Sequence, residues 1–163
     1  MASETTAAQA GAVGNLRFDP MAMLPFCGYN MADYFSHWLS IGDKSKADRL
    51  PKIFFVNWFR RDEDGRFLWP GYGENSRVLK WVFDRVDGKA GAKRTEIGWL
   101  PGPGDIDTTG LKVESSDMDA ILSVDTEGWR SALPQIEQHY AQFGGKLPAR
   151  LGTKLKELAG ALG

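Results

Sequence analysis

The segment 57–75, which reads NWFRRDEDGRFLWPGYGEN, constrains the fold of this chain more than any other stretch. Large aromatic side chains flank an acidic turn in this segment, and Pro and Gly residues then interrupt the extended pattern. We therefore expect a hairpin around Asp64-Gly65, followed by a Gly-rich loop that leads into a helix. The aromatic residues are Trp58, Phe59, Phe67, Trp69 and Tyr72.

The same segment carries the residue types that a flat heteroaromatic base needs. A base stacked on an aromatic side chain gains about 1–3 kcal/mol. The amide of Asn75 can donate to the O6 atom of guanine, where adenine presents an amino group instead. Gly71 and Gly73 let the backbone approach a ring edge. From the residues alone, a purine pocket and a buried aromatic core both stay open, because aromatic side chains dominate the buried area of any fold.

The composition is that of an ordinary globular domain of 163 residues, with 42% hydrophobic and 25% charged residues. A net charge of −1 gives no bulk attraction to nucleic acid or to a membrane surface. Cys27 is the only cysteine, so an intrachain disulfide and a zinc site made of cysteines are both excluded. The chain has neither a signal-peptide pattern nor an apolar run of about 20 residues. We predict a cytoplasmic protein with no nucleic-acid or membrane partner.

Apolar residues spaced three and four apart predict five helices. They cover residues 30–40, 78–86, 117–122, 129–143 and 147–162. Asn30 is expected to cap the first helix and Gly42 to stop it. Asn75 or Ser76 is expected to cap the second helix. Pro134 lies inside the fourth pattern, so this helix either kinks or begins there.

Strands are fewer than helices in the predicted fold. Lys52–Arg60 is rich in β-branched and aromatic residues and predicts a strand covered on both faces. Glu96–Leu100 predicts a short strand, and residues 1–15 are small and polar enough to form a mobile arm. The alternation of strands and helices predicts an α/β fold. Two or three strands do not make a complete sheet, so we expect an incomplete mixed sheet with flanking helices inside a larger protein.

Several patterns that signal chemistry are absent from the sequence. It contains no G-x-x-x-x-G-K-[ST] phosphate loop, no G-x-G-x-x-G and no H-E-x-x-H. His37 and His139 are far apart and not at the spacing of metal ligands. The carboxylates of residues 62–64 sit on the tip of a turn, where a solvated turn is the simpler interpretation. We predict no catalytic residue and no metal ligand in this chain.

Three blocks of the sequence resemble the C-terminal part of the GTP-dependent phosphoenolpyruvate carboxykinases. They are SETTAA (Ser3–Ala8), DPMAMLPFCGYN (Asp19–Asn30) and the run Leu50–Arg85, in which NWFRRD precedes FLWPGYGEN. The resemblance covers residues 1–150, and its SETTAA and CGYN variants are most similar to actinobacterial members. It implies the C-terminal part of a mononucleotide-binding domain. Residues 1–15 would be a lid-like mobile segment, and residues 16–163 the guanine-binding portion of a larger catalytic domain.

The resemblance also implies which residues bind the nucleotide. Three aromatic side chains would surround the guanine, and Asn75 would read its edge. Tyr72 stands where many members of the family have Phe, which keeps a stacking face but adds a hydroxyl at the pocket rim. The implied nucleotide-binding residues are Phe59, Phe67, Tyr72, Gly73, Glu74 and Asn75.

The family interconverts oxaloacetate and phosphoenolpyruvate, with GTP as the phosphoryl donor and release of carbon dioxide. A Mn²⁺ or Mg²⁺ ion clamps the transferred group. Members are much longer than this chain, and their phosphate loop, metal ligands and substrate-binding arginines lie upstream. We expect GTP or GDP as cofactor, oxaloacetate and phosphoenolpyruvate as substrates, and the upstream part of the same enzyme as partner. The chain alone should be inactive. The alternative is an inactive fragment that acts only as a weak purine-nucleotide-binding or interaction module.

Overall fold

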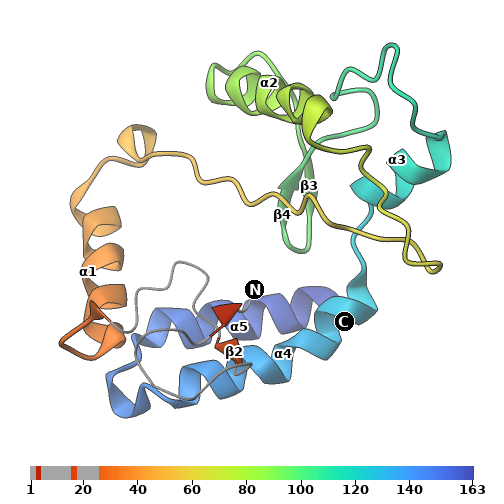
Figure 1. Ribbon diagram of the computed structural model, residues 1–163. Coiled ribbons are helices and arrows are strands. Elements are labelled where there is room, and N and C mark those ends of the chain that lie inside the picture. Colours follow the sequence, from red (N-terminus) through yellow and green to blue (C-terminus); the bar gives the residue numbers. More distant parts are fainter. Residues whose placement is uncertain (1–2, 5–15, 18–25) are drawn as a thin grey trace. The chain divides into compact units, whose positions relative to one another are not determined.

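The computed structural model describes the backbone of Ser3–Glu4 and Leu16–Arg17 and the whole of residues 26–163 (Figure 1). The chain divides into two compact units. Unit 1 comprises Met1–Leu50 and Glu127–Gly163, and unit 2 comprises Pro51–Thr126. The lid-like segment predicted at residues 1–15 lies outside the described residues, apart from the backbone of Ser3–Glu4. The prediction of a single guanine-binding portion over residues 16–163 stays a prediction.

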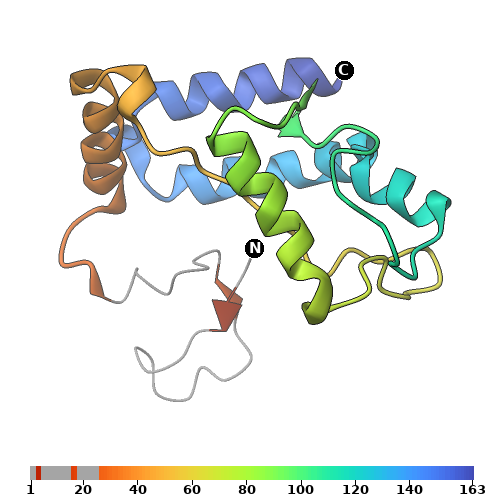
Figure 2. The ribbon, with the colours of Figure 1, turned by 90° about the horizontal axis from the view of Figure 1, so that it is seen from above.

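Unit 1 is mainly helical. Its elements are β1 (Ser3–Glu4), β2 (Leu16–Arg17), α1 (Met31–Lys44), the 3₁₀ helix η2 (Ala47–Arg49), α4 (Thr126–Ala141), η4 (Gly144–Lys146) and α5 (Ala149–Leu162). The two short strands pair antiparallel. Near the start of α4, Arg130 donates from Nε to the carbonyl of Gly163 beyond the end of α5, at 2.9 Å. The two helices therefore run antiparallel, and they lie side by side in Figure 1 and in Figure 2.

Contacts at both ends of α1 attach it to η4 and to the first turn of α5. Near its start, Asp33 forms an ion pair with Lys146 at 3.3 Å. Near its end, Asp43 pairs with Arg150 at 2.8 Å. Between them, the Phe35 ring meets the ring of the buried Phe143 edge-on at a centroid distance of 5.3 Å. The ion pairs are exposed and add little stability, so the aromatic contact provides most of the packing.

The helix predictions for unit 1 are largely confirmed. Asn30 caps α1, since its Oδ1 accepts from the backbone N–H of Ala32 at 2.9 Å. The predicted stop at Gly42 is wrong, because α1 continues to Lys44. A single glycine weakens a helix by about 1 kcal/mol and does not end it unless the backbone turns there. Pro134 lies inside α4 and does not begin it.

Unit 2 contains fewer regular elements. They are the 3₁₀ helix η3 (Tyr72–Glu74), α2 (Asn75–Val86), β3 (Lys93–Thr95), β4 (Gly98–Leu100) and α3 (Ser115–Leu122). The strand predicted over residues 96–100 begins later, at Gly98, because Glu96 and Ile97 form the turn that joins β3 to β4. The sequence analysis predicted no strand at β3, whose sequence KRT is basic, because lysine is depleted in strands.

The core of unit 2 forms around Trp69, Trp81 and Ile106, each only 5–6% exposed. The Phe54 ring meets the Trp81 ring edge-on, with their centroids 6.0 Å apart. Half-buried hydrophobic residues from the extended segment, α2, α3 and the loops complete this cluster. They are Phe54, Trp58, Val78, Val82, Ala90, Ala92, Leu111, Met118 and Ile121. This cluster holds the loop before α2 against the rest of the unit.

The strand predicted over Lys52–Arg60 is wrong as stated. The segment is extended, but the structure assigns no strand there. Its side chains alternate: Phe54 and Trp58 are half-buried, whereas Ile53 and Phe55 are 89% and 77% exposed. Only one face is covered, and no neighbouring strand pairs with the segment in the described part of the chain.

The predicted hairpin is present only as a tight turn. A single antiparallel bridge joins Arg61 to Phe67, and Leu68 donates its backbone N–H to the carbonyl of Arg60 at 3.0 Å. Gly65 lies at the tip with φ of +80°, a conformation that favours glycine. The bridge sets the two arms of the turn side by side.

The described residues thus combine helices with two small antiparallel sheets, which agrees with the coarse α/β prediction. A larger mixed sheet stays a prediction. No helix in the described residues is long and apolar enough to cross a membrane.

Candidate nucleotide-base site

The turn in unit 2 exposes two aromatic rings. Phe59 is 72% exposed and Phe67 is 45% exposed, on opposite arms of the turn. Their ring centroids lie 6.2 Å apart with an interplanar angle of 62°. The Arg61 guanidinium lies over the Phe67 ring at 4.1 Å from its centroid, a cation–π contact that covers part of one face. Phe59 therefore offers the more open stacking face of the two.

The third predicted aromatic residue, Tyr72, begins η3 and is 91% exposed. Gly71 precedes it with φ of +120°, so the turn into η3 requires glycine at this position. Asn75 follows η3 directly and is the first residue of α2. The backbone N–H of Asn75 donates to the Tyr72 carbonyl. Gly73 faces open space, with no atom within 4 Å of where a Cβ would stand.

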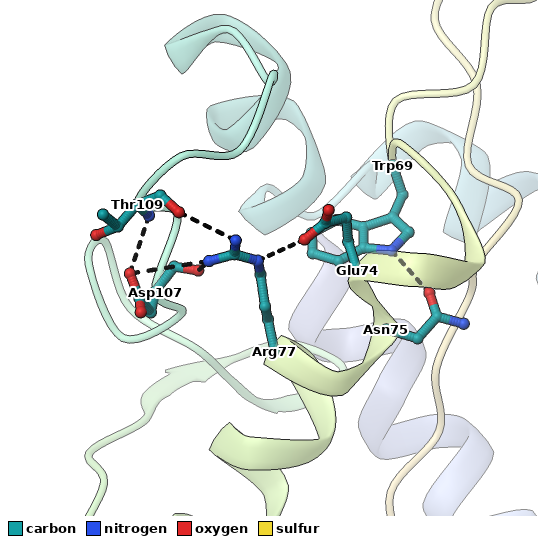
Figure 3. A network of polar contacts seen from close by, with 6 residues as sticks. All are labelled: Trp69, Glu74, Asn75, Arg77, Asp107 and Thr109. Atoms are coloured by element: carbon teal, nitrogen blue, oxygen red, sulfur yellow. Dashed lines mark hydrogen bonds and ion pairs between the residues drawn. The ribbon is translucent and has the colours of Figure 1, made fainter.

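The prediction that Asn75 or Ser76 caps α2 is wrong, because both residues lie inside the helix. The helix begins at Asn75 itself, and the preceding Glu74 makes no side-chain capping bond. The Oδ1 atom of Asn75 instead accepts a hydrogen bond from the indole Nε1–H of Trp69 at 2.8 Å (Figure 3). This bond leaves the two N–H groups of Nδ2 as the donors that the side chain can offer elsewhere.

Arg77 ties the start of α2 to the loop after β4 (Figure 3). Its Nε donates to the Glu74 carboxylate at 2.6 Å. Its other nitrogens donate to the backbone carbonyls of Asp107 and Thr109, at 2.8 and 3.0 Å. The backbone N–H of Thr109 in turn donates to the Asp107 carboxylate and lowers its pKa. Glu74 is therefore held as a partner of Arg77, one turn before it on the same helical face.

Two further arginines attach the turn to α3. Arg66 donates through both terminal nitrogens to the buried Asp117, at 2.8 and 3.0 Å. The hydrogen bond from Arg66 lowers the pKa of Asp117, and the same pairing raises the pKa of Arg66. Arg60 donates to the carbonyl of Ser123, at the end of α3, at 2.9 Å. These bonds fix the turn that carries Phe59 and Phe67.

A separate hollow of about 710 Å³ lies beside the turn in unit 2. None of the predicted nucleotide-binding residues lines it. Its lining mixes charges of both signs, and no stacking ring faces it. It is lined by Arg60, Arg61, Asp62, Glu63, Leu68, Ser116, Asp117, Ala120 and Asp125. The predicted aromatic residues therefore do not indicate this hollow as the nucleotide-base site.

The predicted nucleotide-binding residues form two groups along the chain, one on the turn and one at η3 and the start of α2. Phe59 and Phe67 contact each other on the turn, whereas Tyr72 begins η3 and Asn75 begins α2 directly after it. No ring contact joins Tyr72 to the two Phe rings within the described residues. Sequence reasoning missed the Trp69 indole N–H and Arg77, and it did not anticipate the contact of Arg61 with the Phe67 ring. Only Arg77 left a signal, because Glu74 stands three residues before it.

No group of three or more His, Cys, Asp or Glu side chains could hold a metal ion in the described part of the chain. Binding of a Mn²⁺ or Mg²⁺ ion by residues upstream of this chain stays a prediction.

Comparison with known proteins identifies the family. A family model described as "Phosphoenolpyruvate carboxykinase C-terminal P-loop domain" matches residues 1–161. The chain is 58% identical over 159 residues to the phosphoenolpyruvate carboxykinase [GTP] of Neocallimastix frontalis, covering 97% of this chain and 26% of that protein. The protein of the same name from Treponema pallidum (strain Nichols) is 54% identical over 158 residues, which are 96% of this chain and 26% of that protein.

A third relative aligns along the whole chain. The phosphoenolpyruvate carboxykinase [GTP] of Paenarthrobacter aurescens (strain TC1) is 50% identical over 163 residues, which are 100% of this chain and 27% of that protein. The chain thus spans about a quarter of the length of these curated relatives. A match over nearly every residue, at half identity or more, leaves one conclusion: the chain belongs to the family of GTP-dependent phosphoenolpyruvate carboxykinases.

Proposed function

We propose that this chain carries the guanine-binding part of a GTP-dependent phosphoenolpyruvate carboxykinase. The complete enzyme would convert oxaloacetate and GTP to phosphoenolpyruvate, GDP and carbon dioxide. The observation that carries the proposal is the arrangement around Asn75. Its amide is fixed by Trp69 at 2.8 Å, and Asn75 stands three residues after Tyr72, whose ring lies outside the core of the unit.

Exposure separates the proposed site from the core. Phe59 and Tyr72, at 72% and 91% exposed, leave most of their surface in water. Exposed apolar rings are typical of ligand and partner surfaces. Phe59 and Tyr72 would stack against the base, Phe67 would contact its edge, and Nδ2 of Asn75 would donate to the O6 atom of guanine.

Two more of the implied residues have supporting roles in this proposal. Glu74 holds Arg77 and so fixes the start of α2, where Asn75 stands. Gly73 has open space where a side chain would be, which leaves room for a base edge to approach the backbone.

The rest of the activity would come from the upstream part of the same enzyme. The 163 residues hold no phosphate-loop motif, and oxaloacetate, phosphoenolpyruvate and the metal ion would bind upstream residues. Residues 1–15 would act as the lid. The exposed Ile53 and Phe55, with no paired strand in the described residues, offer a face that this upstream part would cover.

A second candidate is an inactive module that binds purine nucleotides weakly. The absence of a phosphate loop from the sequence favours it, because phosphates supply much of the affinity for a nucleotide through charge-assisted hydrogen bonds. Both candidates include a guanine-binding site, and titration of GDP, ADP and guanosine into the chain tests for that site. A preference for GDP over ADP supports the guanine site, and equal affinity for GDP and ADP contradicts it.

A chimera separates the two candidates. The region of the Paenarthrobacter aurescens enzyme that aligns with all 163 residues is replaced by this chain. The enzyme proposal predicts GTP-dependent formation of phosphoenolpyruvate by the chimera and none by the 163-residue chain alone. A folded chimera with no activity contradicts the enzyme proposal and leaves the binding module. Formation of phosphoenolpyruvate by the 163-residue chain alone would contradict the prediction that the upstream part of the enzyme is needed.

A further inference from the structure

We propose that Trp69 sets the base selectivity of this site by fixing the orientation of the Asn75 amide. The inference rests on the proposed function, in which Asn75 reads the edge of a purine. Trp69 would not touch the base. It would act as a positioning residue, and the ligand class that it selects is the 6-oxopurine nucleotides.

The hydrogen bond between the two side chains permits only one amide orientation. An indole N–H can donate but cannot accept. Its bond to Oδ1 of Asn75 at 2.8 Å turns Nδ2 to the other side of the amide, as Figure 3 shows. An amide rotated by half a turn would set two donors against each other and leave both without an acceptor. Asn75 therefore presents donors, and not its carbonyl, away from Trp69.

The position of the indole is itself fixed by packing. Trp69 is 6% exposed and packs with Trp81 and Ile106. Ile106 directly precedes Asp107, whose backbone carbonyl accepts from Arg77 at 2.8 Å. A displaced indole would leave a cavity in this core, which makes the movement costly. The amide is thus oriented by a side chain that cannot easily move.

The orientation of the amide decides which base is accepted. Guanine and hypoxanthine carry an acceptor oxygen at position 6, whereas adenine carries an amino group. Donors from Nδ2 match the oxygen and oppose the amino group. The two orientations of an amide differ little in shape, so an unfixed Asn75 could turn its carbonyl toward adenine. Selectivity at this residue therefore needs a partner such as Trp69.

Trp81 provides a matched comparison in the same core. It is 5% exposed, and its Nε1 is a buried nitrogen with no hydrogen-bond partner in the part of the chain that the structure describes. The core thus tolerates an indole N–H that bonds to nothing. Substitution of either tryptophan by phenylalanine removes one indole from the cluster, but only Trp69→Phe removes the partner of Asn75.

The experiment compares Trp69→Phe with Trp81→Phe in the 163-residue chain. Dissociation constants for GDP, inosine diphosphate and ADP are measured by calorimetry, and thermal melts monitor folding. In Trp69→Phe, the preference for GDP over ADP should fall about two- to tenfold, with a gain in ADP affinity. Inosine diphosphate should follow GDP, because it shares O6 but lacks the 2-amino group. Trp81→Phe should have the same ratio of GDP affinity to ADP affinity as the wild-type chain.

The outcomes separate this inference from the proposed function. If the wild-type chain prefers GDP and Trp69→Phe keeps that preference, the inference is overturned and the guanine site stands. If the wild-type chain does not prefer GDP, both are overturned. A fall of the same size in Trp81→Phe would assign the effect to the core and not to Asn75, and would also overturn the inference.

A second measurement leaves the core intact. In Asn75→Ala, the NMR signal of the Trp69 indole proton should shift, and the proton should exchange faster with solvent. The Trp81 indole proton serves as the internal control. An unchanged Trp69 indole signal in Asn75→Ala would overturn the inference even if Trp69→Phe does not fold.

Discussion

Two sets of aromatic side chains in unit 2 have opposite surroundings. Trp69 and Trp81 are 6% and 5% exposed and form the core with Ile106. Phe59 and Tyr72 are 72% and 91% exposed, although Tyr72 is only three residues from Trp69. The chain between them turns at Gly71, whose φ of +120° directs the backbone away from the core. Gly71 thus separates the buried Trp69 from the exposed Tyr72, whereas Phe59 is exposed on the turn that precedes Trp69.

The comparison shows that aromatic content alone does not reveal a binding site. Trp69 shares one sequence segment with Phe59 and Tyr72, and by residue type all three would fit either a core or a pocket. They differ in burial, because other apolar side chains enclose Trp69 and Trp81, whereas most of the surface of Phe59 and Tyr72 stays in water. We therefore expect substitutions in the first set to change stability, and substitutions in the second set to change binding.

The largest expected effect is on stability, from Trp81→Ala. Removal of this buried ring should lower the free energy of unfolding by about 3–5 kcal/mol. Ile106→Val, in the same cluster, is the milder control and should cost about 0.5–1.5 kcal/mol. Urea unfolding followed by circular dichroism measures both. An unfolding midpoint that Trp81→Ala leaves in place would show that this cluster is not the core of the unit.

A smaller effect, on binding alone, is expected from Tyr72→Ala. Loss of the stacking face should weaken GDP binding by about 1–3 kcal/mol. Stability should change by less than about 0.5 kcal/mol, because the side chain is 91% exposed. Phe83→Ala is the matched control, since Phe83 is another exposed ring, on α2 at 69%. Equal losses of GDP affinity in the two variants would argue against a specific stacking role for Tyr72.

Much of the helical structure could be predicted from the sequence. The apolar spacing located α1 and α2, and Asn30 caps α1 as a residue of its type should. These features are local, so residues close in sequence determine them. The extended segment 52–60 was misjudged for the opposite reason. Its composition fits a strand covered on both faces, but coverage depends on distant residues, and only one face is covered here.

The candidate site was only partly accessible to sequence reasoning. The residue types near Asn75 suggested a purine pocket, and the family resemblance named its members. The pattern also predicted that Asn75 or Ser76 would cap α2, but the Trp69 indole took the Asn75 oxygen instead. An amide near a helix start has several possible partners, and tertiary packing selects among them. The interaction that orients Asn75 thus became visible only in the structure.

The smallest expected effect concerns the pH dependence of the turn that carries Phe59 and Phe67. The hydrogen bond from Arg66 lowers the pKa of the Asp117 carboxyl below its unfolded value of about 3.9. The stabilisation is therefore complete above that value and is lost as the pH falls through the lower, folded-state pKa. Asp117→Asn should lower the melting temperature at pH 7, and the difference from the wild-type chain should shrink below about pH 4.

Thermal melts between pH 3 and 7 test this prediction, with Glu63→Gln as the control. Glu63 is an exposed carboxylate on the same turn and has no ion pair in the described part of the chain. Its substitution should have little effect at any pH in this range. A difference between Asp117→Asn and the wild-type chain that stays constant from pH 7 to pH 3 would contradict the prediction. Such a result would mean that Asp117 acts through packing or neutral hydrogen bonds, and not as the charged partner of Arg66.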